Sequence, residues 1–167
     1  YHTRKYVESI ASFKKSLLLQ EDWEPLKGLG LSFLKTYQLE KAIAALQKSL
    51  LLQEDWISLQ NLGIAHYLNN QFVHQAITSL EKSLQLEENW YSFKILGFAL
   101  LKTCQYKKAI SNFQKSLLLK EDCESYMALG FSLFNNNNYK EAIASLQKSI
   151  LLKKDWNSYR ALGWSLL

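Results

Sequence analysis

A Leu-Gly pair recurs five times in this chain of 167 residues. The intervals between successive pairs are 33, 34, 33 and 33 residues. The pairs are Leu29-Gly30, Leu62-Gly63, Leu96-Gly97, Leu129-Gly130 and Leu162-Gly163. A constant period of this length is typical of stacked supersecondary units. Each unit of such an array buries its apolar face only against its neighbours, so the array exposes a long concave surface.

Other positions recur with the same period, which indicates that whole units are duplicated. Residues 42–56 and 142–156 are identical at 11 of 15 positions. An Ala-Ile pair and, six residues later, a Lys-Ser pair recur in each complete unit, for example Ala42-Ile43 and Lys48-Ser49. One unit is a residue longer than the others, and the extra residue is most simply placed in the turn near Phe72.

The segment from residue 56 to residue 68 has the apolar spacing of an amphipathic helix. One stripe of this helix contains Leu59, Leu62, Gly63, His66 and Tyr67, so His66 is expected to be structural. A residue suited to capping precedes the helix in each unit, at Asp22, Asp55, Asn89, Asp122 and Asp155. Since glycine within a helix costs about 1 kcal/mol relative to alanine, its recurrence predicts that another helix approaches closely there.

A second helix is predicted after a short polar turn in each unit. In one unit this helix runs through Leu39, Ala42, Ile43, Leu46, Ser49, Leu50 and Leu52. The turns are 36–38, 69–71, 103–105 and 135–138, and the last is a run of four Asn, a residue that tolerates left-handed backbone. Helices paired through short turns form α-hairpins, so the expected fold is an all-α solenoid of about ten helices.

The period also divides the chain. We call the helix that carries the Leu-Gly pair the first-type helix and the other the second-type helix. A single repeat array is expected over residues 1–167, with these parts: a lone second-type helix at 4–22, four full repeats at 23–55, 56–89, 90–122 and 123–155, and a lone first-type helix at 156–167.

At these residues the chain resembles the tetratricopeptide repeat family. The resemblance includes the Leu-Gly pair, a bulky residue opening the second helix such as Tyr106, the Ala-Ile pair, and a later small residue such as Ser116. It implies a right-handed superhelix of antiparallel helix pairs that binds proteins on its concave face. Two features depart from the family: Glu54 or Glu121 stands where a proline usually separates repeats, and most units have 33 residues.

The resemblance also implies which side chains face the concave groove. One column of the first-type helices is apolar and includes Leu31, Ile64, Phe98, Phe131 and Trp164. A second column one turn later includes Leu34, Tyr67, Leu101 and Phe134, and a third includes Lys27, Gln60, Lys94, Met127 and Arg160. Asparagines that clamp a peptide carboxylate in some family members are absent from the first column.

We therefore expect a protein–protein interaction scaffold. A helix or extended peptide of a partner would dock in an apolar, aromatic groove, and Lys27, Lys94 and Arg160 would favour acidic flanks. The alternative is that tighter curvature buries the apolar column between adjacent helices.

The second-type helices carry a row of lysines. They are Lys15, Lys48, Lys82, Lys115 and Lys148. Such a row can meet a phosphate backbone or an anionic membrane surface, but an outward cation that favours solubility is the simpler interpretation. The net charge of +5 is modest and no aromatic residues are interleaved, so no nucleic-acid partner is expected. No apolar run approaches the ~18 residues that favour membrane insertion.

No pattern points to catalysis, so the chain is not expected to be an enzyme or to need a cofactor or metal. It has three histidines, and neither a nucleophile motif nor metal-ligand spacing surrounds them. Cys104 and Cys123 flank a predicted helix about 21 Å long, too far apart for a disulfide. Unpaired cysteines and the lack of a signal peptide weakly indicate the cytoplasm.

Two other functions stay open at this point. The lone terminal helices together make one complete unit, so copies of the chain could associate head to tail as a homo-oligomer. The array could also recruit substrate to an enzyme domain of a longer parent chain.

Overall fold

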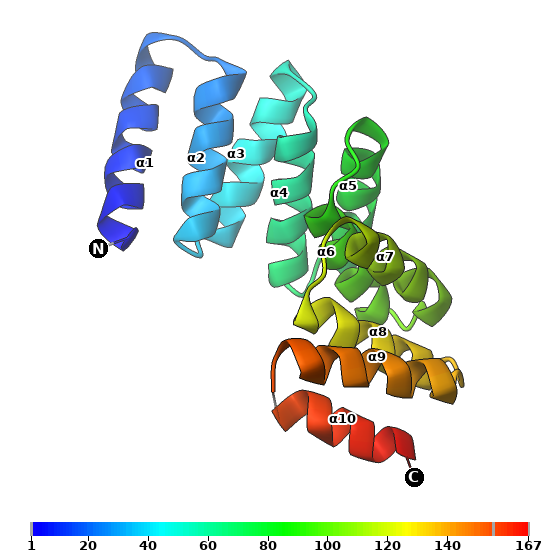
Figure 1. Cartoon of the computed structure of the whole chain (residues 1–167). Coiled ribbons are helices and arrows are strands. Elements are labelled where there is room, and N and C mark those ends of the chain that lie inside the picture. The colour runs from blue at the N-terminus through cyan, green and yellow to red at the C-terminus, as the bar shows by residue number, and fades with distance from the viewer. Residues whose placement is uncertain (1, 155, 167) are drawn as a thin grey trace. The chain divides into compact units, whose positions relative to one another are not determined.

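The computed structural model describes residues 2–154 and 156–166, without the side chains of His2, Thr3 and Trp164. These residues form ten α-helices joined by short turns and linkers, and neither β-strand nor β-bridge occurs among them. The chain divides into two compact units, Tyr1–Glu87 and Glu88–Leu167. The predicted all-α fold of helix pairs is therefore confirmed (Figure 1).

The first unit contains five helices, each packed against the next in chain order (Figure 1). They are α1 (His2–Leu19), α2 (Trp23–Lys35), α3 (Leu39–Leu52), α4 (Trp56–Leu68) and α5 (Val73–Leu86). The first-type helices α2 and α4 also contact each other.

The second unit also contains five helices, but it begins and ends with a first-type helix. They are α6 (Trp90–Lys102), α7 (Tyr106–Leu119), α8 (Cys123–Asn135), α9 (Tyr139–Leu152) and α10 (Trp156–Leu166). The first-type helices α6, α8 and α10 contact one another in series as well as their second-type neighbours. The second unit thus places three first-type helices side by side.

The recurrent glycines lie where two helices approach closely, as predicted. A Cβ atom at Gly30 would lie 2.6 Å from the Cγ atom of Leu46, and one at Gly97 would lie 2.7 Å from the ring of Phe113. At Gly63 and Gly130, a leucine of the following helix likewise occupies the space that a Cβ atom would need. At Gly163 in α10, no side chain or neighbouring helix of the described residues lies within 4 Å of the Cβ position.

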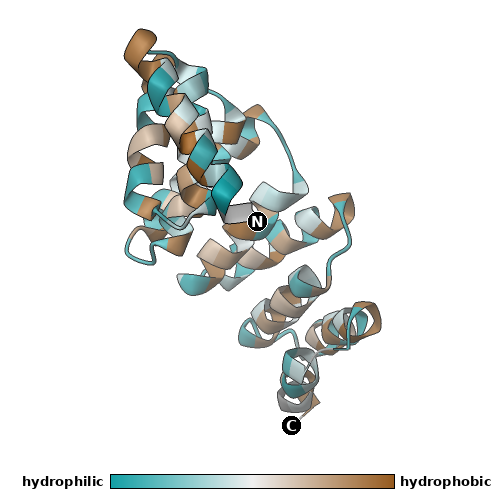
Figure 2. Ribbon diagram, turned by 90° about the vertical axis from the view of Figure 1, so that its left-hand side faces the viewer, coloured by the Kyte–Doolittle hydropathy of each residue, from teal (hydrophilic) through white to brown (hydrophobic). Residues whose placement is uncertain are grey.

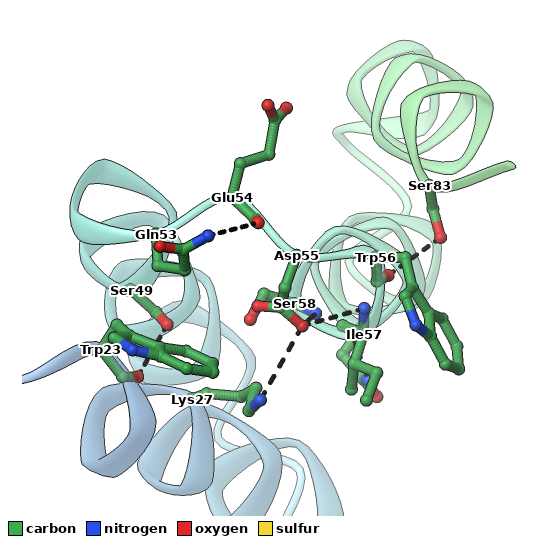
Figure 3. A network of polar contacts seen from close by, with 11 residues as sticks. Trp23, Lys27, Ser49, Gln53, Glu54, Asp55, Trp56, Ile57, Ser58 and Ser83 are labelled. Carbon is green, nitrogen blue, oxygen red and sulfur yellow. Dashed lines mark hydrogen bonds and ion pairs between the residues drawn. The ribbon is translucent and has the colours of Figure 1, made fainter. Parts of the chain in front are cut away.

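The predicted N-caps are confirmed at four of five positions. Asp22, Asp55, Asn89 and Asp122 each accept a hydrogen bond from a backbone N–H of the helix that follows. At Asp55 the donors are the backbone N–H groups of Ile57 and Ser58, both at 3.1 Å (Figure 3). The fifth position, Asp155, lies outside the described residues.

A buried serine explains the recurrent Lys-Ser pair. The Oγ atom of Ser49 in α3 donates a hydrogen bond of 2.8 Å to the carbonyl oxygen of Trp23, the first residue of α2 (Figure 3). The same bond recurs from Ser83 to Trp56, from Ser116 to Trp90 and from Ser149 to Cys123. Each second-type helix therefore ends next to the beginning of its own first-type helix.

The turns explain the one unequal unit. Three residues join the helices of a pair in three repeats, whereas residues 69–72 join α4 to α5. The extra residue therefore lies in the turn near Phe72, as predicted. Each turn contains one residue with positive φ: Tyr37, Asn70, Cys104 and Asn137. Asn137 suits the left-handed conformation that its run of asparagines predicts.

His66 in α4 is a buried residue packed beside Phe72, with ring centroids 5.8 Å apart. Its Nδ1 atom has no hydrogen-bond partner in the structure. Burial lowers the pKa of His66, although a hydrogen bond with the backbone of Gln75 acts in the opposite direction. These contacts support the predicted structural role of this histidine.

Candidate functional site

An apolar hollow of about 560 Å³ opens on the second unit. Its walls come from the three first-type helices α6, α8 and α10, and α9 contributes Leu146. The lining residues are Phe98, Leu101, Met127, Ala128, Phe131, Phe134, Leu146, Asn157, Arg160, Ala161 and Ser165. Its volume lies within the range of about 300–1,000 Å³ that is usual for ligand pockets.

The aromatic walls are held in place by neighbouring rings. Phe98 packs edge-on against Phe113, with ring centroids 5.1 Å apart, and Phe113 is fully buried against Gly97. Phe134 makes a similar contact with Tyr139 at 5.5 Å. These contacts within the protein hold the walls in place, which lowers the ordering cost of binding.

Phe131 is the most exposed aromatic residue of the hollow. Half of its surface, 50%, is accessible to solvent, although it lies in the middle of α8. Leu146 is fully buried beneath. A large ring that remains half exposed above a packed floor is available to a partner, since its burial on binding would remove apolar surface from water.

Arg160 supplies positive charge at the hollow. It is the one charged residue among the described lining residues. Its guanidinium carbon lies 4.6 Å from the centre of the Trp156 ring, and its Nη2 atom donates a hydrogen bond to the Oδ1 atom of Asn157 at 3.3 Å. The side chain is exposed and makes no ion pair with a described carboxylate, so it can meet an anionic group of a ligand.

Lys94 was expected at the edge of the groove, and the structure places it in an ion cluster instead. Only 7% of the residue is exposed. Its Nζ atom lies 2.7 Å from the Oδ2 atom of Asp122 and 2.6 Å from the Oε2 atom of Glu124. The lysine in α6 thereby ties the cap and first turn of α8, and its charge is already neutralised.

The ion cluster shifts the pKa values of its members. Burial acts to lower the pKa of Lys94, but hydrogen bonds and attraction from Asp122 and Glu124 outweigh it and raise that pKa. Burial likewise acts to raise the pKa of Asp122, but bonds from Lys94 and Ser125 hold it below its usual value. Both shifts favour the charged forms, so the cluster stabilises the α6–α8 contact.

Other predicted groove residues lie in the first unit and differ from one another in solvent exposure. Leu34 and Ile64 are buried, and Leu31 and Tyr67 are partly exposed. Lys27 lies 4.2 Å from the ring of Trp23 and 3.9 Å from the Oδ1 atom of Asp55 (Figure 3), and Gln60 is partly exposed. In this unit, part of the expected apolar column is therefore core.

Of the predicted site residues, the hollow brings together six, namely Phe98, Leu101, Met127, Phe131, Phe134 and Arg160. The side chain of Trp164, also predicted, lies outside the described residues. Asn157 and Ser165 also line the hollow and were not predicted from the sequence. Asn157 lies three residues before Arg160 on the same helix, and this helical spacing could have pointed to it.

Neither a metal-binding cluster nor a membrane-spanning helix is found among the described residues. No three His, Cys, Asp or Glu side chains gather there as a metal site would require. No helix of the described chain is long and apolar enough to cross a membrane.

The family model of the tetratricopeptide repeat matches residues 124–155, which span most of α8 and all of α9. The same Leu-Gly, Ala-Ile and Lys-Ser positions recur in the helix pairs that precede this match. Residues 124–155 therefore match a tetratricopeptide repeat, and the whole chain shares the fold of solved tetratricopeptide-repeat structures. No curated protein matches its sequence at a significant level.

Solved structures of tetratricopeptide-repeat proteins share the fold. YrrB, described as having an unusual peptide-binding site, is 25% identical with a TM-score of 0.83, and the match covers 92% of this chain and 81% of YrrB. MamA of Desulfovibrio magneticus RS-1 is 22% identical with a TM-score of 0.80, and the match covers 86% of this chain and 82% of MamA.

A third similar structure comes from a larger protein. It is a chain of the APC/C hetero-tetramer Cut9–Hcn1, 22% identical with a TM-score of 0.75. The match covers 98% of this chain but 33% of that chain, so the present sequence spans about a third of its length. The similar structures thus include one described as having a peptide-binding site and one that is part of a protein assembly. The tetratricopeptide repeat is typically a non-catalytic interaction module.

Proposed function

We propose that this chain is an interaction scaffold whose hollow on α6, α8 and α10 binds a peptide or helix of a partner protein. The observation that carries the proposal is the half-exposed ring of Phe131 among preorganised apolar walls, with Arg160 beside it. An apolar side chain of the partner would fill the hollow, and an acidic residue near it would pair with Arg160.

The chemistry of the hollow favours this ligand class over a small polar metabolite. Most of the lining is apolar, and its polar side chains, Asn157, Arg160 and Ser165, all come from α10. A ligand that is apolar along one side and acidic along the other would therefore lie with its acidic side toward α10. An amphipathic helix or an extended peptide has this two-sided character.

The test begins with selection of peptides from a random displayed library on the immobilised protein. We expect the selected peptides to combine a large apolar residue with a nearby Asp or Glu. Affinity of one such peptide is then measured for the wild type, Phe131→Ser, Arg160→Gln and the matched control Tyr159→Ser. Tyr159 is as exposed as Phe131, at 50%, but does not line the hollow.

Phe131→Ser is expected to weaken binding about tenfold or more, as removal of a central aromatic anchor usually does. Tyr159→Ser should leave the affinity unchanged, and circular dichroism should show that all variants are folded. Selected peptides without acidic residues would remove the role of Arg160. Equal affinities of wild type and Phe131→Ser would place the binding surface elsewhere.

A second proposal concerns self-association through α10. Among the described residues, no neighbouring side chain or helix lies within 4 Å of the Cβ position of Gly163, whereas helix neighbours lie against those of Gly30, Gly63, Gly97 and Gly130. Trp156 and Leu166 are also exposed. A second-type helix from another copy of the chain would fit this face. Sedimentation at increasing concentration should then detect oligomers that Gly163→Leu abolishes, and a wild type that remains monomeric would refute the proposal.

A further inference from the structure

A second cavity, of about 370 Å³, adjoins the hollow in the second unit. Met127 and Asn157 line both cavities, so the two are adjacent. The second cavity lies where α8 begins and α9 ends. Its other walls include Cys123, Ser149, Lys153 and Ser158. We call this cavity the Cys123 pocket.

Cysteine stands at position 123 where the other repeats have tryptophan. The first residue of the first-type helix is Trp23, Trp56, Trp90 or Trp156 in those repeats. The backbone is arranged alike in both cases, since Ser149 donates a hydrogen bond of 2.8 Å to the carbonyl oxygen of Cys123, as Ser116 does to that of Trp90. The small side chain of Cys123 therefore leaves room that an indole takes up elsewhere.

The side chains that flank the Trp90 ring have counterparts in the Cys123 pocket. The Nζ atom of Lys120 lies 3.9 Å from the centre of that ring, and the Nζ atom of Lys94 lies 5.9 Å from it. One repeat later, these two positions are Lys153 and Met127, and both line the Cys123 pocket. The pocket thus has side chains in place to flank an aromatic ring.

The corresponding place in the first unit shows how a ring fits there. The indole of Trp23 lies between Ser49 and Lys27, and the Nζ atom of Lys27 is 4.2 Å from the ring centre (Figure 3). In the repeat of Cys123, these two neighbours correspond to Ser149 and Met127. A ring in the Cys123 pocket would therefore lie between residues of α8 and α9, as Trp23 lies between residues of α2 and α3.

We propose that the Cys123 pocket takes an aromatic side chain of the same partner whose apolar side chain fills the hollow, an inference that rests on the proposed function. Hydrophilic linkers join the helices (Figure 2), and Lys153 is the exposed first residue of one of them. Its ammonium group would lie over the face of the ring, as that of Lys120 does over Trp90. The ring is uncharged, so its binding does not depend on the balance of lysines and carboxylates around the pocket.

Indole is the probe that tests the pocket without a partner. Titrated into the isotope-labelled 167-residue chain, indole is expected to shift the amide resonances of Ser149 and Lys153 with a dissociation constant of about 1 mM, as suits so small a ligand. Cys123→Trp should abolish these shifts and raise the midpoint of thermal unfolding, because its own ring fills the cavity. Indole shifts that occur only at the hollow would overturn the proposal, as would the lack of any saturable shift.

Peptides selected on the immobilised wild type extend the test to a partner. We expect them to carry an aromatic residue in addition to the apolar and acidic residues described above. For one such peptide, Cys123→Trp should weaken binding about tenfold, whereas Cys123→Ser leaves the pocket open and should bind like the wild type. Replacement of the aromatic residue of the peptide by alanine should remove the difference between the wild type and Cys123→Trp.

A matched control and the possible outcomes separate this inference from the proposed function. Cys104→Trp adds the same ring in an exposed turn outside both cavities, at a position where the first unit has Tyr37, and should bind like the wild type. Binding that Phe131→Ser weakens and Cys123→Trp does not would overturn the aromatic anchor and keep the scaffold function. Indole shifts at the pocket without any selected peptide would support the aromatic site and refute the peptide-binding function.

Discussion

Replacement of Gly130 by alanine tests the close packing on which each helix pair depends. A Cβ atom at Gly130 would lie 2.6 Å from the Cγ atom of Leu146 and 3.2 Å from the carbonyl oxygen of Ala142. Leu146 is fully buried, so its branch point cannot move aside without disturbing the contact between α8 and α9. The same substitution at Gly163 meets no neighbouring side chain or helix of the described residues within 4 Å and serves as the matched control.

The expected magnitudes follow from two opposing effects. Alanine stabilises a helix by up to about 1 kcal/mol relative to glycine, and this gain applies to both variants. Overpacking in a close-packed interior costs about 1–3 kcal/mol, and this cost applies only at Gly130. We therefore expect Gly163→Ala to be neutral or slightly stabilising. Gly130→Ala should have a free energy of unfolding lower than that of Gly163→Ala by about 1–3 kcal/mol.

Urea unfolding followed by circular dichroism measures this difference, and thermal unfolding should show a shift of about 2–4 °C per kcal/mol for a chain of this length. Gly130→Ala in a Leu146→Ala background should recover part of its cost, because the leucine that blocks the new methyl group is gone. A Gly130→Ala variant as stable as Gly163→Ala would refute the packing explanation of the recurrent glycine.

Three further predictions concern buried polar groups. Burial lowers the pKa of His66 below 6.5, so the imidazole is protonated in the unfolded chain before it is protonated in the folded one. The free energy of unfolding should therefore fall as pH falls below about 6.5. In urea unfolding, His66→Leu should flatten this pH dependence. Lys94→Met should lower the free energy of unfolding by about 2–3 kcal/mol at neutral pH, because it leaves Asp122 without its cation. This loss should shrink as pH falls from 3.8, the ordinary pKa of an aspartate, toward the lower pKa that Asp122 has in the folded wild type. Ser116→Ala should cost about 1–2 kcal/mol in thermal unfolding, because the carbonyl of Trp90 loses its bond, and an unchanged midpoint would contradict this assignment.

Most of the fold could be predicted because the same local sequence pattern recurs in every repeat. The glycine of the Leu-Gly pair predicted a close helix contact, and the contact with Leu46 at Gly30 confirms it. Asp55 predicted a helix start, and its hydrogen bonds to the first turn confirm that start. Caps, turns and helix periodicity depend on neighbours along the chain, so a single sequence contains the information they need.

The site could be predicted only in part, because exposure depends on neighbours that are distant in sequence. Lys27, Lys94 and Arg160 occupy one column of the repeat, yet Lys94 is buried between Asp122 and Glu124 while Arg160 is exposed. Ile64 and Phe131 also share a column, and only Phe131 is half exposed. These differences come from the residues that the adjacent repeat supplies.

The sequence by itself determined the repeat period, the helix pairs and the positions where two helices must touch, since these follow from local spacing and from the size of glycine. Only the tertiary structure decided which apolar side chains are covered. Leu46 and Leu52 both belong to the predicted second helix of one repeat, yet Leu46 is fully buried and 52% of Leu52, at the end of the helix, is exposed. Burial is set by packing between helices, whereas helical periodicity reports only which residues share a face.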